Sequence, residues 1–309
     1  MKTIWGEIDI CDSHAHLLSR PFFRSLAGET EVEGLVARLG LEVPGEDATE
    51  LAGRWVEELD RHGLKRSVMI ASAPGDEDSA ADAQRAYPHR LVGYFMLDPT
   101  AADAAERARR AVERLGLRGI CLFPAMHKFS VQDERLRPIC ELAGERPGVV
   151  VFVHKGVLTV GVRKKLGLPS PFDMSYSNPM DLHRVAQEFP RVNFVLPHFG
   201  AGYFRETLML GDLCPNVHVD TSSSNSWIRY VPGLSGLKEV FSRALQVFGP
   251  RRILFGSDSS FFPRGWNAEI LQTQLPILEQ LQLGRADAAA ILGGNLERLV
   301  GVQTASGAA

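Results

Sequence analysis

The chain lacks a long apolar run, an excess of positive charge and an N-terminal targeting pattern. None of its apolar runs reaches membrane-spanning length. Its formal net charge of −3 gives no electrostatic basis for binding nucleic acid or an anionic membrane surface. The N-terminal segment contains one lysine and no extended apolar stretch before a small-residue cleavage site, so we expect no signal peptide. These absences predict no nucleic-acid partner and no membrane partner.

The chain also has few cysteines and no nucleotide-binding loop. Its four cysteines are widely spaced without a Cys-x-x-Cys pair, and Cys11 and Cys121 lie in apolar segments where buried, reduced cysteine is usual. This usage favours a cytoplasmic protein. The sequence has no Gly-x-Gly-x-x-Gly after its first apolar segment and no phosphate-binding loop, which disfavours a dinucleotide-binding protein.

What the chain does have is a regular alternation of short apolar segments with helix-length segments. The first strand begins at Ile8 and runs into His14 and His16; the others are expected at Ser67–Ser72, Leu91–Leu97, Leu117–Phe123, Val149–Val153, Val192–Leu196, Val217–Asp220 and Ile253–Gly256. Strands that are continuously apolar form parallel sheets buried on both faces. Eight such units predict an α/β fold, a (β/α)8 TIM barrel that forms one domain over residues 1–302. An open doubly wound sheet is the alternative, and 303–309 are expected to be a flexible tail.

One connection is longer than a barrel needs. Residues 17–61 follow the first strand and include a helical stretch, 47–62, with Leu51, Trp55 and Leu59 on one face. The segment leaves the strand at the end where barrel active sites lie. We therefore expect an inserted lid that covers the pocket mouth and forms one wall of the substrate site. The alternative is that it packs on the outside of the barrel or builds a subunit interface.

Candidate metal ligands follow four of the expected strands. His14 and His16 are two residues apart, so their imidazoles point to the same side of an extended chain. His154, His198 and Asp258 follow the fifth, sixth and eighth strands. Because the reacting groups of a (β/α)8 barrel come from the C-terminal ends of its strands, these side chains are expected at one rim. Imidazole and carboxylate groups are ligands of divalent transition metals.

The sequence around these residues resembles the amidohydrolase superfamily, and within it the branch that includes aminocarboxymuconate-semialdehyde decarboxylase and related decarboxylases and hydrolases. The matching motifs are Asp12-Ser13-His14-Ala15-His16, Val153-His154, Leu196-Pro197-His198-Phe199-Gly200 and Phe255-Gly256-Ser257-Asp258. The resemblance extends over nearly the whole chain. It implies a metal-dependent enzyme with a small-molecule substrate.

The resemblance also implies the roles of these residues. One divalent metal ion, most simply zinc, would be held by His14, His16, His154 and Asp258, although manganese, iron and cobalt tolerate the same ligands. The ion would lower the pKa of its water to about 7 and so provide hydroxide at neutral pH. Asp258 and His198 would be catalytic, with Asp258 hydrogen-bonding the water and His198 moving a proton or polarising a substrate oxygen.

A second metal ion is not expected. Binuclear members of the superfamily usually add a bridging lysine or glutamate at the end of the fourth strand, whereas here that strand ends in 122–124, Leu-Phe-Pro. His127 and Lys128 come only later, on an expected loop. A homodimer is compatible with the resemblance.

Candidate substrate-binding residues combine aromatic rings with guanidinium groups. They are Arg20, Phe22 and Arg54 in the expected lid, and Trp227, Arg229, Phe262 and Arg264 after the seventh and eighth strands. This mixture suits an organic acid or an aromatic ring.

Three functions remain open at this point. The leading hypothesis is a hydrolase in which a metal-bound hydroxide attacks an ester, lactone or amide carbon. The second is a nonoxidative decarboxylase of a carboxylated aromatic or dienoic acid that uses the same metal site. The third is a barrel that has lost its chemistry, against which the intact set of five polar residues argues. The motifs are common to the first two.

Overall fold

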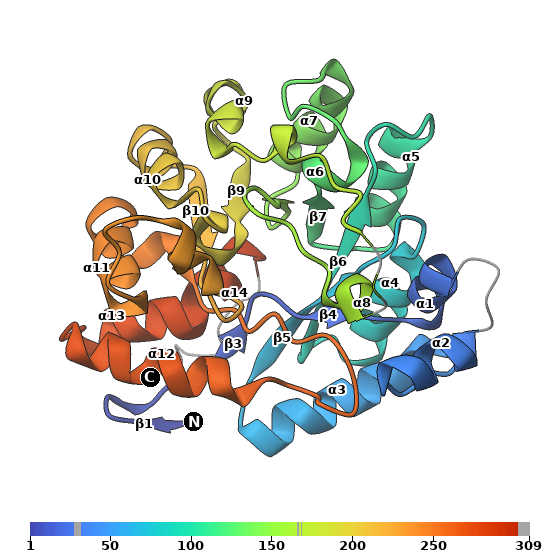
Figure 1. Ribbon diagram of the computed structural model, residues 1–309, viewed down its shortest axis with the longest axis horizontal. Coiled ribbons are helices and arrows are strands. Elements are labelled where there is room, and N and C mark those ends of the chain that lie inside the picture. Colours follow the sequence, from blue (N-terminus) through green and yellow to red (C-terminus); the bar gives the residue numbers. More distant parts are fainter. Residues whose placement is uncertain (28–31, 166, 168, 302–309) are drawn as a thin grey trace.

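A curled sheet of parallel strands, with helices on its outer side, forms the centre of the structure (Figure 1). This computed structural model describes residues 1–27, 32–165, 167 and 169–301. The main sheet contains β3 (Cys11–Asp12), β4 (His16–Leu17), β5 (Arg66–Ala71), β6 (Leu91–Leu97), β7 (Gly119–Leu122), β8 (Val150–Val153), β9 (Asn193–Leu196), β10 (Val217–Asp220) and β11 (Ile253–Leu254). An antiparallel pair, β1 (Lys2–Thr3) and β2 (Gly6–Glu7), precedes it.

The strands of the main sheet follow one another in sequence order around a ring. Neighbours are parallel in the order β3-β5-β6-β7-β8-β9-β10-β11, and β4 also pairs with β5. The backbone N–H of Ser13 donates to the carbonyl of Phe255 (2.9 Å), and that of His16 donates to the carbonyl of Ser259 (2.7 Å). These bonds join the first strand to the last. The expected parallel α/β barrel is therefore confirmed, and the open sheet is not what forms.

The strands form where the apolar segments predict them. β5 and β6 are buried along their whole length, as expected for a sheet covered on both faces. The first strand departs from the prediction, because it is interrupted between Asp12 and His16. There the side chain of Asp12 accepts the backbone N–H of His14 (2.9 Å), which replaces a partner from a neighbouring strand.

Most of the helices lie outside the sheet, whereas α8 lies in front of the strands (Figure 1). The helices up to α11 connect successive strands, and α12 to α14 follow the last one. After β5 they are α4 (Glu77–Ala86), α5 (Ala104–Arg109), α6 (Pro124–His127), α7 (Arg137–Glu145), α8 (Gly161–Lys165), α9 (Leu182–Glu188), α10 (Phe204–Leu213), α11 (Leu237–Phe248), α12 (Ala268–Gln280), α13 (Arg285–Ala289) and α14 (Asn295–Leu299). Within the described ranges, no helix combines the length and the apolar character that crossing a membrane requires.

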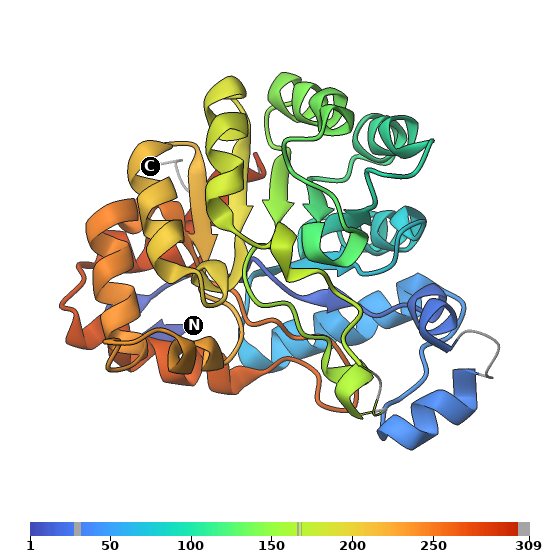
Figure 2. The ribbon, with the colours of Figure 1, turned by 45° about the horizontal axis from the view of Figure 1, so that its top comes forward.

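Three helices separate β4 from β5: α1 (Arg20–Ala27), α2 (Val32–Leu39) and α3 (Ala48–His62). α3 begins after Asp47, whose side chain accepts the N–H of Thr49 (2.7 Å), and ends at Gly63 with a φ of 66°. α1 and α2 pack together around a small apolar cluster that includes Phe23 and Val36. In Figure 2 these two helices lie at the edge of the molecule, beside the ring of barrel helices.

Gly256 lies where the last strand passes close to the first. A Cβ atom at this position would lie 2.9 Å from Cβ of His14 and 3.0 Å from Cβ of Ser222. We expect Gly256→Ala to lower the free energy of unfolding by about 1–3 kcal/mol, because an added methyl group forces packed neighbours to move. Chemical denaturation measures this loss. Gly284→Ala is the matched control, since nothing lies within 4 Å of a Cβ there; equal losses in the two variants would contradict the prediction.

Candidate active site

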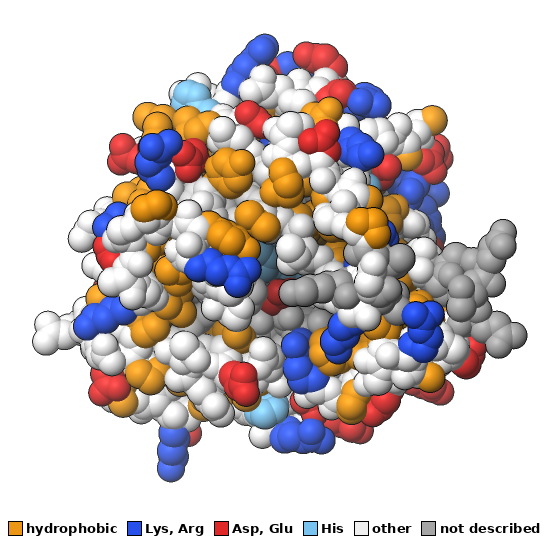
Figure 3. Space-filling view, viewed as in Figure 1, with side chains coloured by type: hydrophobic (Ala, Val, Ile, Leu, Met, Phe, Trp, Pro, Cys, Tyr) orange, Lys and Arg blue, Asp and Glu red, His pale blue; other side chains and the backbone are white. Residues whose placement is uncertain are grey.

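A cavity of about 470 Å³ opens at the C-terminal end of the strands. His14, His16, His154, His198 and Asp258 all line it. Figure 3 shows the hollow near the middle of this face, with histidine and acidic atoms visible at its bottom and hydrophobic and basic side chains around it. Side chains that are far apart in the sequence, at the ends of four different strands, thus line one cavity.

His14, His16 and Asp258 form the tightest group in it. Nε2 of His14 lies 3.2 Å from Nε2 of His16. Oδ1 of Asp258 lies 3.2 Å from Nε2 of His16 and 3.7 Å from Nε2 of His14. Asp258 takes a left-handed backbone conformation with a φ of 61°, and its N–H donates to the carbonyl of His14 (2.8 Å). Residues other than glycine adopt this conformation rarely, and such strain is typical of functional sites.

When these two histidines are neutral, their hydrogen bonds place the ring hydrogen on Nδ1 and leave Nε2 without hydrogen. The Ser72 hydroxyl donates to the carbonyl of Ile70 (2.9 Å), so its oxygen accepts from Nδ1 of His16 (2.7 Å). The carboxylate of Asp220 accepts from Nδ1 of His14 (2.9 Å). Two bare ring nitrogens and a carboxylate oxygen therefore face one another at 3.2–3.7 Å. A proton or a metal ion between these atoms relieves the repulsion of their lone pairs, and this donor set fits a divalent metal ion.

His154 lies beside this group. Its ring stacks on Phe123, with 5.6 Å between the ring centroids, and meets the ring of His198 at 5.3 Å. Burial, together with the neighbouring His198 and His14, lowers the pKa of His154 to about 3. Its Nδ1 atom is buried and has no hydrogen-bond partner among the described residues. A neutral imidazole with an unpaired nitrogen is suited to binding a metal, so the donor chemistry fits the predicted role.

Asp12 supports the site from behind. Its carboxylate accepts the backbone N–H groups of His14 (2.9 Å) and Ser257 (3.0 Å) and the indole N–H of Trp266 (2.8 Å). These bonds hold the first strand against the last one. The two segments that carry His14 and Asp258 are therefore kept in register by a side chain that does not line the cavity.

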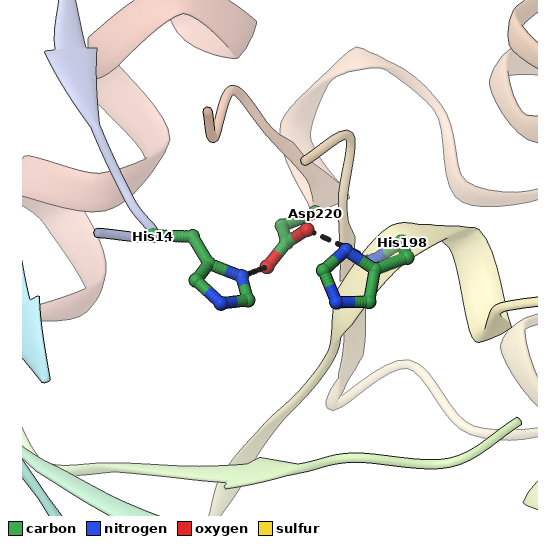
Figure 4. Close-up of side chains that lie close together, drawn as sticks. All are labelled: His14, His198 and Asp220. Carbon is green, nitrogen blue, oxygen red and sulfur yellow. Dashed lines mark hydrogen bonds and ion pairs between the residues drawn. The ribbon is translucent and has the colours of Figure 1, made fainter. Parts of the chain in front are cut away.

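His198 lies on a tight turn after β9. It has a φ of 55° and a ψ of 33°, and its backbone N–H donates to Oδ1 of Asp220 (3.0 Å). Figure 4 shows Asp220 between His14 and His198, bonded to both. Burial lowers the pKa of His198, which favours the neutral form of its ring. The ring lies 5.0 Å from the ring of His14, centroid to centroid.

Three residues of this network escaped the sequence analysis: Ser72, Asp220 and Ser222. The only signal for them was position, since Ser72 and Asp220 follow or end strands at the same rim as the predicted ligands. Serine and aspartate are common after strands, so the pattern alone did not distinguish them. Their role depends on side-chain contacts across strands that are far apart in sequence.

Of the seven expected substrate-binding residues, Phe22 and Arg264 line the cavity. Lys165 lines it too and was not predicted. The guanidinium of Arg264 lies 4.3 Å from the centre of the Phe261 ring, and Nζ of Lys165 lies 5.5 Å from it. The cavity thus has two cations around one aromatic side chain.

Two predicted substrate-binding arginines of the 17–61 segment, Arg20 and Arg54, do not line the cavity, and each pairs with an acidic residue. Arg20 pairs with Glu33, and Arg54 pairs with Glu42. The guanidinium of Arg54 also lies 3.9 Å from the centre of the Phe262 ring, which does not line the cavity. Arg20, Arg54 and Phe262 are therefore placed outside the cavity lining by local partners that the sequence pattern did not reveal.

The two candidates after β10 also lie outside the cavity lining. Trp227 is buried, and its indole N–H donates to the side chain of Asn225 (3.0 Å). Arg229 lies over the ring of Tyr230, 4.8 Å from its centre. Both side chains are occupied by neighbours in their own loop.

The sequence profile of the amidohydrolase family matches residues 11–302. The chain therefore belongs to this family of enzymes, as the motifs at the strand ends indicated. A curated relative, Protein fluG of Emericella nidulans, is 32% identical over 87 residues, which make up 28% of this chain and 10% of that protein. The chain thus matches only about a tenth of that relative's length.

Solved structures with the same fold are similar at low sequence identity. 5-Carboxyvanillate decarboxylase from Sphingomonas paucimobilis has a TM-score of 0.66 at 16% identity, over 96% of this chain and 100% of that one. An amidohydrolase from Burkholderia multivorans with bound zinc has a TM-score of 0.62 at 18% identity, over 96% and 100%. A probable 2-pyrone-4,6-dicarboxylic acid hydrolase from Acinetobacter baumannii, with citric acid bound, has a TM-score of 0.59 at 16% identity, over 95% of this chain and 100% of that one. Hydrolases and decarboxylases both occur among them, so the fold leaves the reaction open.

Proposed function

We propose that the chain is a metal-dependent hydrolase that adds water to an ester, lactone or amide carbon of a small organic acid. The observation that carries the proposal is the convergence of Nε2 of His14, Nε2 of His16 and the Asp258 carboxylate in one cavity. His154 would complete a set of four ligands, with zinc as the ion we expect first. When bound, such an ion supplies Lewis acidity to a carbonyl oxygen and to water.

The residues of the chain supply the proton transfers. The Asp258 side chain is 34% exposed, so water and substrate can both reach its carboxylate. We assign to Asp258 the removal of a proton from the attacking water; His198 would then accept this proton on its ring and pass it to the leaving oxygen or nitrogen. The hydroxyl of the water is added to the acyl carbon and its hydrogen to the leaving group, so the reaction consumes one water molecule.

The lining of the cavity supports an apolar substrate with one anionic group. Its walls include Leu18, Phe22, Met96 and Phe123, and Lys165 and Arg264 provide positive charge. A volume of about 470 Å³ is in the range of small-molecule sites. We propose that the 17–61 segment contributes the wall formed by Leu18 and Phe22, and that a carboxylate of the substrate lies near the two cations.

Nonoxidative decarboxylation is the second candidate, and the apolar, aromatic lining favours it. A carboxylated ring would fit beside Phe123 and Phe261, with its carboxylate held by the same cations. We place hydrolysis first because the partly exposed Asp258 is reached by water, which a hydrolase consumes and a decarboxylase does not.

Isotope labelling distinguishes the two reactions. The zinc-loaded enzyme would be incubated in ¹⁸O-labelled water with a panel of aryl esters, lactones and carboxylated phenols. Hydrolysis is expected to place one ¹⁸O atom in the acid product without releasing carbon dioxide. Release of carbon dioxide from the carboxylated phenols, with no ¹⁸O in any acid, would replace the proposal by its alternative.

Arg264 offers a direct test of the anionic subsite. We expect Arg264→Met to raise KM for substrates that carry a carboxylate by roughly tenfold or more, because a hydrogen bond to a charged group is lost. The kcat should change less, since this contact would be made equally in the bound substrate and in the transition state. Arg229→Met is the matched control, because Arg229 lies outside the cavity lining. Equal KM values for Arg264→Met and the wild-type enzyme would rule out this subsite.

A further inference from the structure

Two buried side chains behind the cavity have no part in the proposed chemistry. Asp220 is the last residue of β10, and Ser222 follows two residues later; both are 0% exposed. Four donors converge on the Asp220 carboxylate. Oδ2 accepts Nδ1–H of His14 (2.9 Å), and Oδ1 accepts the backbone N–H groups of His198 (3.0 Å) and Ser222 (2.9 Å) and the Ser222 hydroxyl.

The position of the hydroxyl hydrogen decides what Ser222 does to His198. Because the hydroxyl donates to Asp220, its oxygen is left as an acceptor, and it lies 2.9 Å from Nδ1 of His14 and 2.8 Å from Nδ1 of His198. The backbone carbonyl of Ser222 also lies 3.2 Å from this Nδ1. A carbonyl can only accept a hydrogen bond, so both contacts require a hydrogen on Nδ1 of His198.

We infer that Asp220 and Ser222 form a positioning clamp that fixes the neutral tautomer of His198, with its hydrogen on Nδ1 and a bare Nε2. This inference rests on the proposed function for the part that His198 plays in moving protons. A His198 with its hydrogen on Nε2 would leave two Ser222 oxygens facing a bare Nδ1, which costs the desolvation of buried acceptors. The clamp therefore makes His198 a proton acceptor on its cavity side.

The same clamp holds the backbone and the neighbouring histidine. The left-handed turn at His198 takes its N–H out of the strand ladder, and Oδ1 of Asp220 replaces the lost partner. The other oxygen, Oδ2, keeps His14 in the tautomer whose Nε2 faces Asp258. One buried carboxylate thus orients the predicted metal ligand and the predicted proton-transfer residue together.

Nuclear magnetic resonance reads the tautomer directly. The chain would be labelled with ¹⁵N-histidine, and long-range ¹H–¹⁵N spectra would be recorded without metal and with one equivalent of zinc. The His198 signals are assigned by their loss in His198→Ala. We expect a protonated Nδ1 and a bare Nε2 for His198 in both samples. An Nε2–H tautomer in the wild-type protein would overturn the inference.

Variants test whether the clamp sets this tautomer. Ser222→Ala keeps the backbone carbonyl but removes the closer acceptor, so we expect a mixture of tautomers and a kcat that falls by about 10- to 100-fold, with KM and zinc content near the wild-type values. Ser67→Ala is the matched control, since Ser67 is also 0% exposed and its hydroxyl donates to the backbone of Val68, away from the cavity. Wild-type spectra and kcat for Ser222→Ala would overturn the role of Ser222.

Ser222→Thr keeps a hydroxyl and should restore the single tautomer. If it does not fold, the comparison of Ser222→Ala with the wild-type spectrum still decides the question. The spectra need no substrate. If His198 carries its hydrogen on Nδ1 but the enzyme shows no hydrolytic activity, the proposed function is rejected and the clamp is kept. If His198 carries its hydrogen on Nε2 in an active hydrolase, the clamp is rejected and the proposed function is kept.

Discussion

His198→Ala is expected to keep its metal and to lose about 10²- to 10⁴-fold in kcat, the range typical of a group that transfers protons in the transition state. The side chain lines the cavity with the predicted ligands, yet its Nδ1 is bonded to Ser222 and its backbone is held by Asp220. Removing the ring therefore removes a proton carrier while the Nε2 atoms of His14 and His16 stay in place. Zinc content by elemental analysis and steady-state kinetics measure the two effects separately.

His183→Ala is the control for this experiment. His183 lies on α9, and its side chain is not part of the cavity lining. It should keep both the metal and the rate. A His198→Ala enzyme that loses its zinc would show that His198 is a ligand, and one that keeps its full rate would remove it from the mechanism.

Removal of the metal is expected to lower the rate by about three orders of magnitude or more, since Lewis acid stabilisation of a transition state is worth several kcal/mol. One equivalent of zinc per chain should restore the activity, because the two groups of two imidazoles and a carboxylate that the described residues form share His14. In the group with His198, the Asp220 carboxylate is already occupied by hydrogen bonds, which leaves the group with His16 and Asp258 for the ion. Titration of the chelated protein with zinc, followed by activity and by elemental analysis, measures both quantities.

Zinc should also stabilise the fold. A ligand that binds only the native state raises the free energy of unfolding by about 2.7 kcal/mol when its free concentration is a hundred times its Kd. The Tm should therefore rise as zinc is added. His16→Ala, which removes one member of the group, should lose this rise. Two ions per chain at full activity would contradict the single-metal site. A chain that takes up no metal would support the third hypothesis, a barrel without chemistry.

The positions of the strands were readable from the sequence because a parallel barrel buries both faces of each strand. β6 is buried from Leu91 to Leu97, and the apolar segment predicted there has the same bounds. The interruption of the first strand was not readable, because it depends on the carboxylate of Asp12 accepting the N–H of His14. A side-chain bond of this kind leaves no trace in a pattern of apolar residues.

The substrate side was the least readable part of the site. Arg20 and Arg264 look alike in sequence, as single arginines near the expected rim. The structure pairs Arg20 with Glu33 and places Arg264 in the cavity lining beside Asp258. Long charged side chains can reach several partners, and which one they meet depends on how loops pack, which sequence spacing does not encode.

The sequence by itself determined the alternation of strands and helices and the five polar residues that end four of the strands. It could do so because the spacing of apolar residues and the order of segments can be read along the chain, and because parallel strands bring their C-terminal ends to one rim. The tertiary structure alone decided that Asp220 and Ser222 join His14 to His198, and on which nitrogen each ring carries its hydrogen. That choice depends on donors and acceptors placed 2.8–3.2 Å away by residues more than twenty positions distant, such as Ser222 against His198 and Asp220 against His14. Only the closed barrel brings these groups within hydrogen-bonding distance.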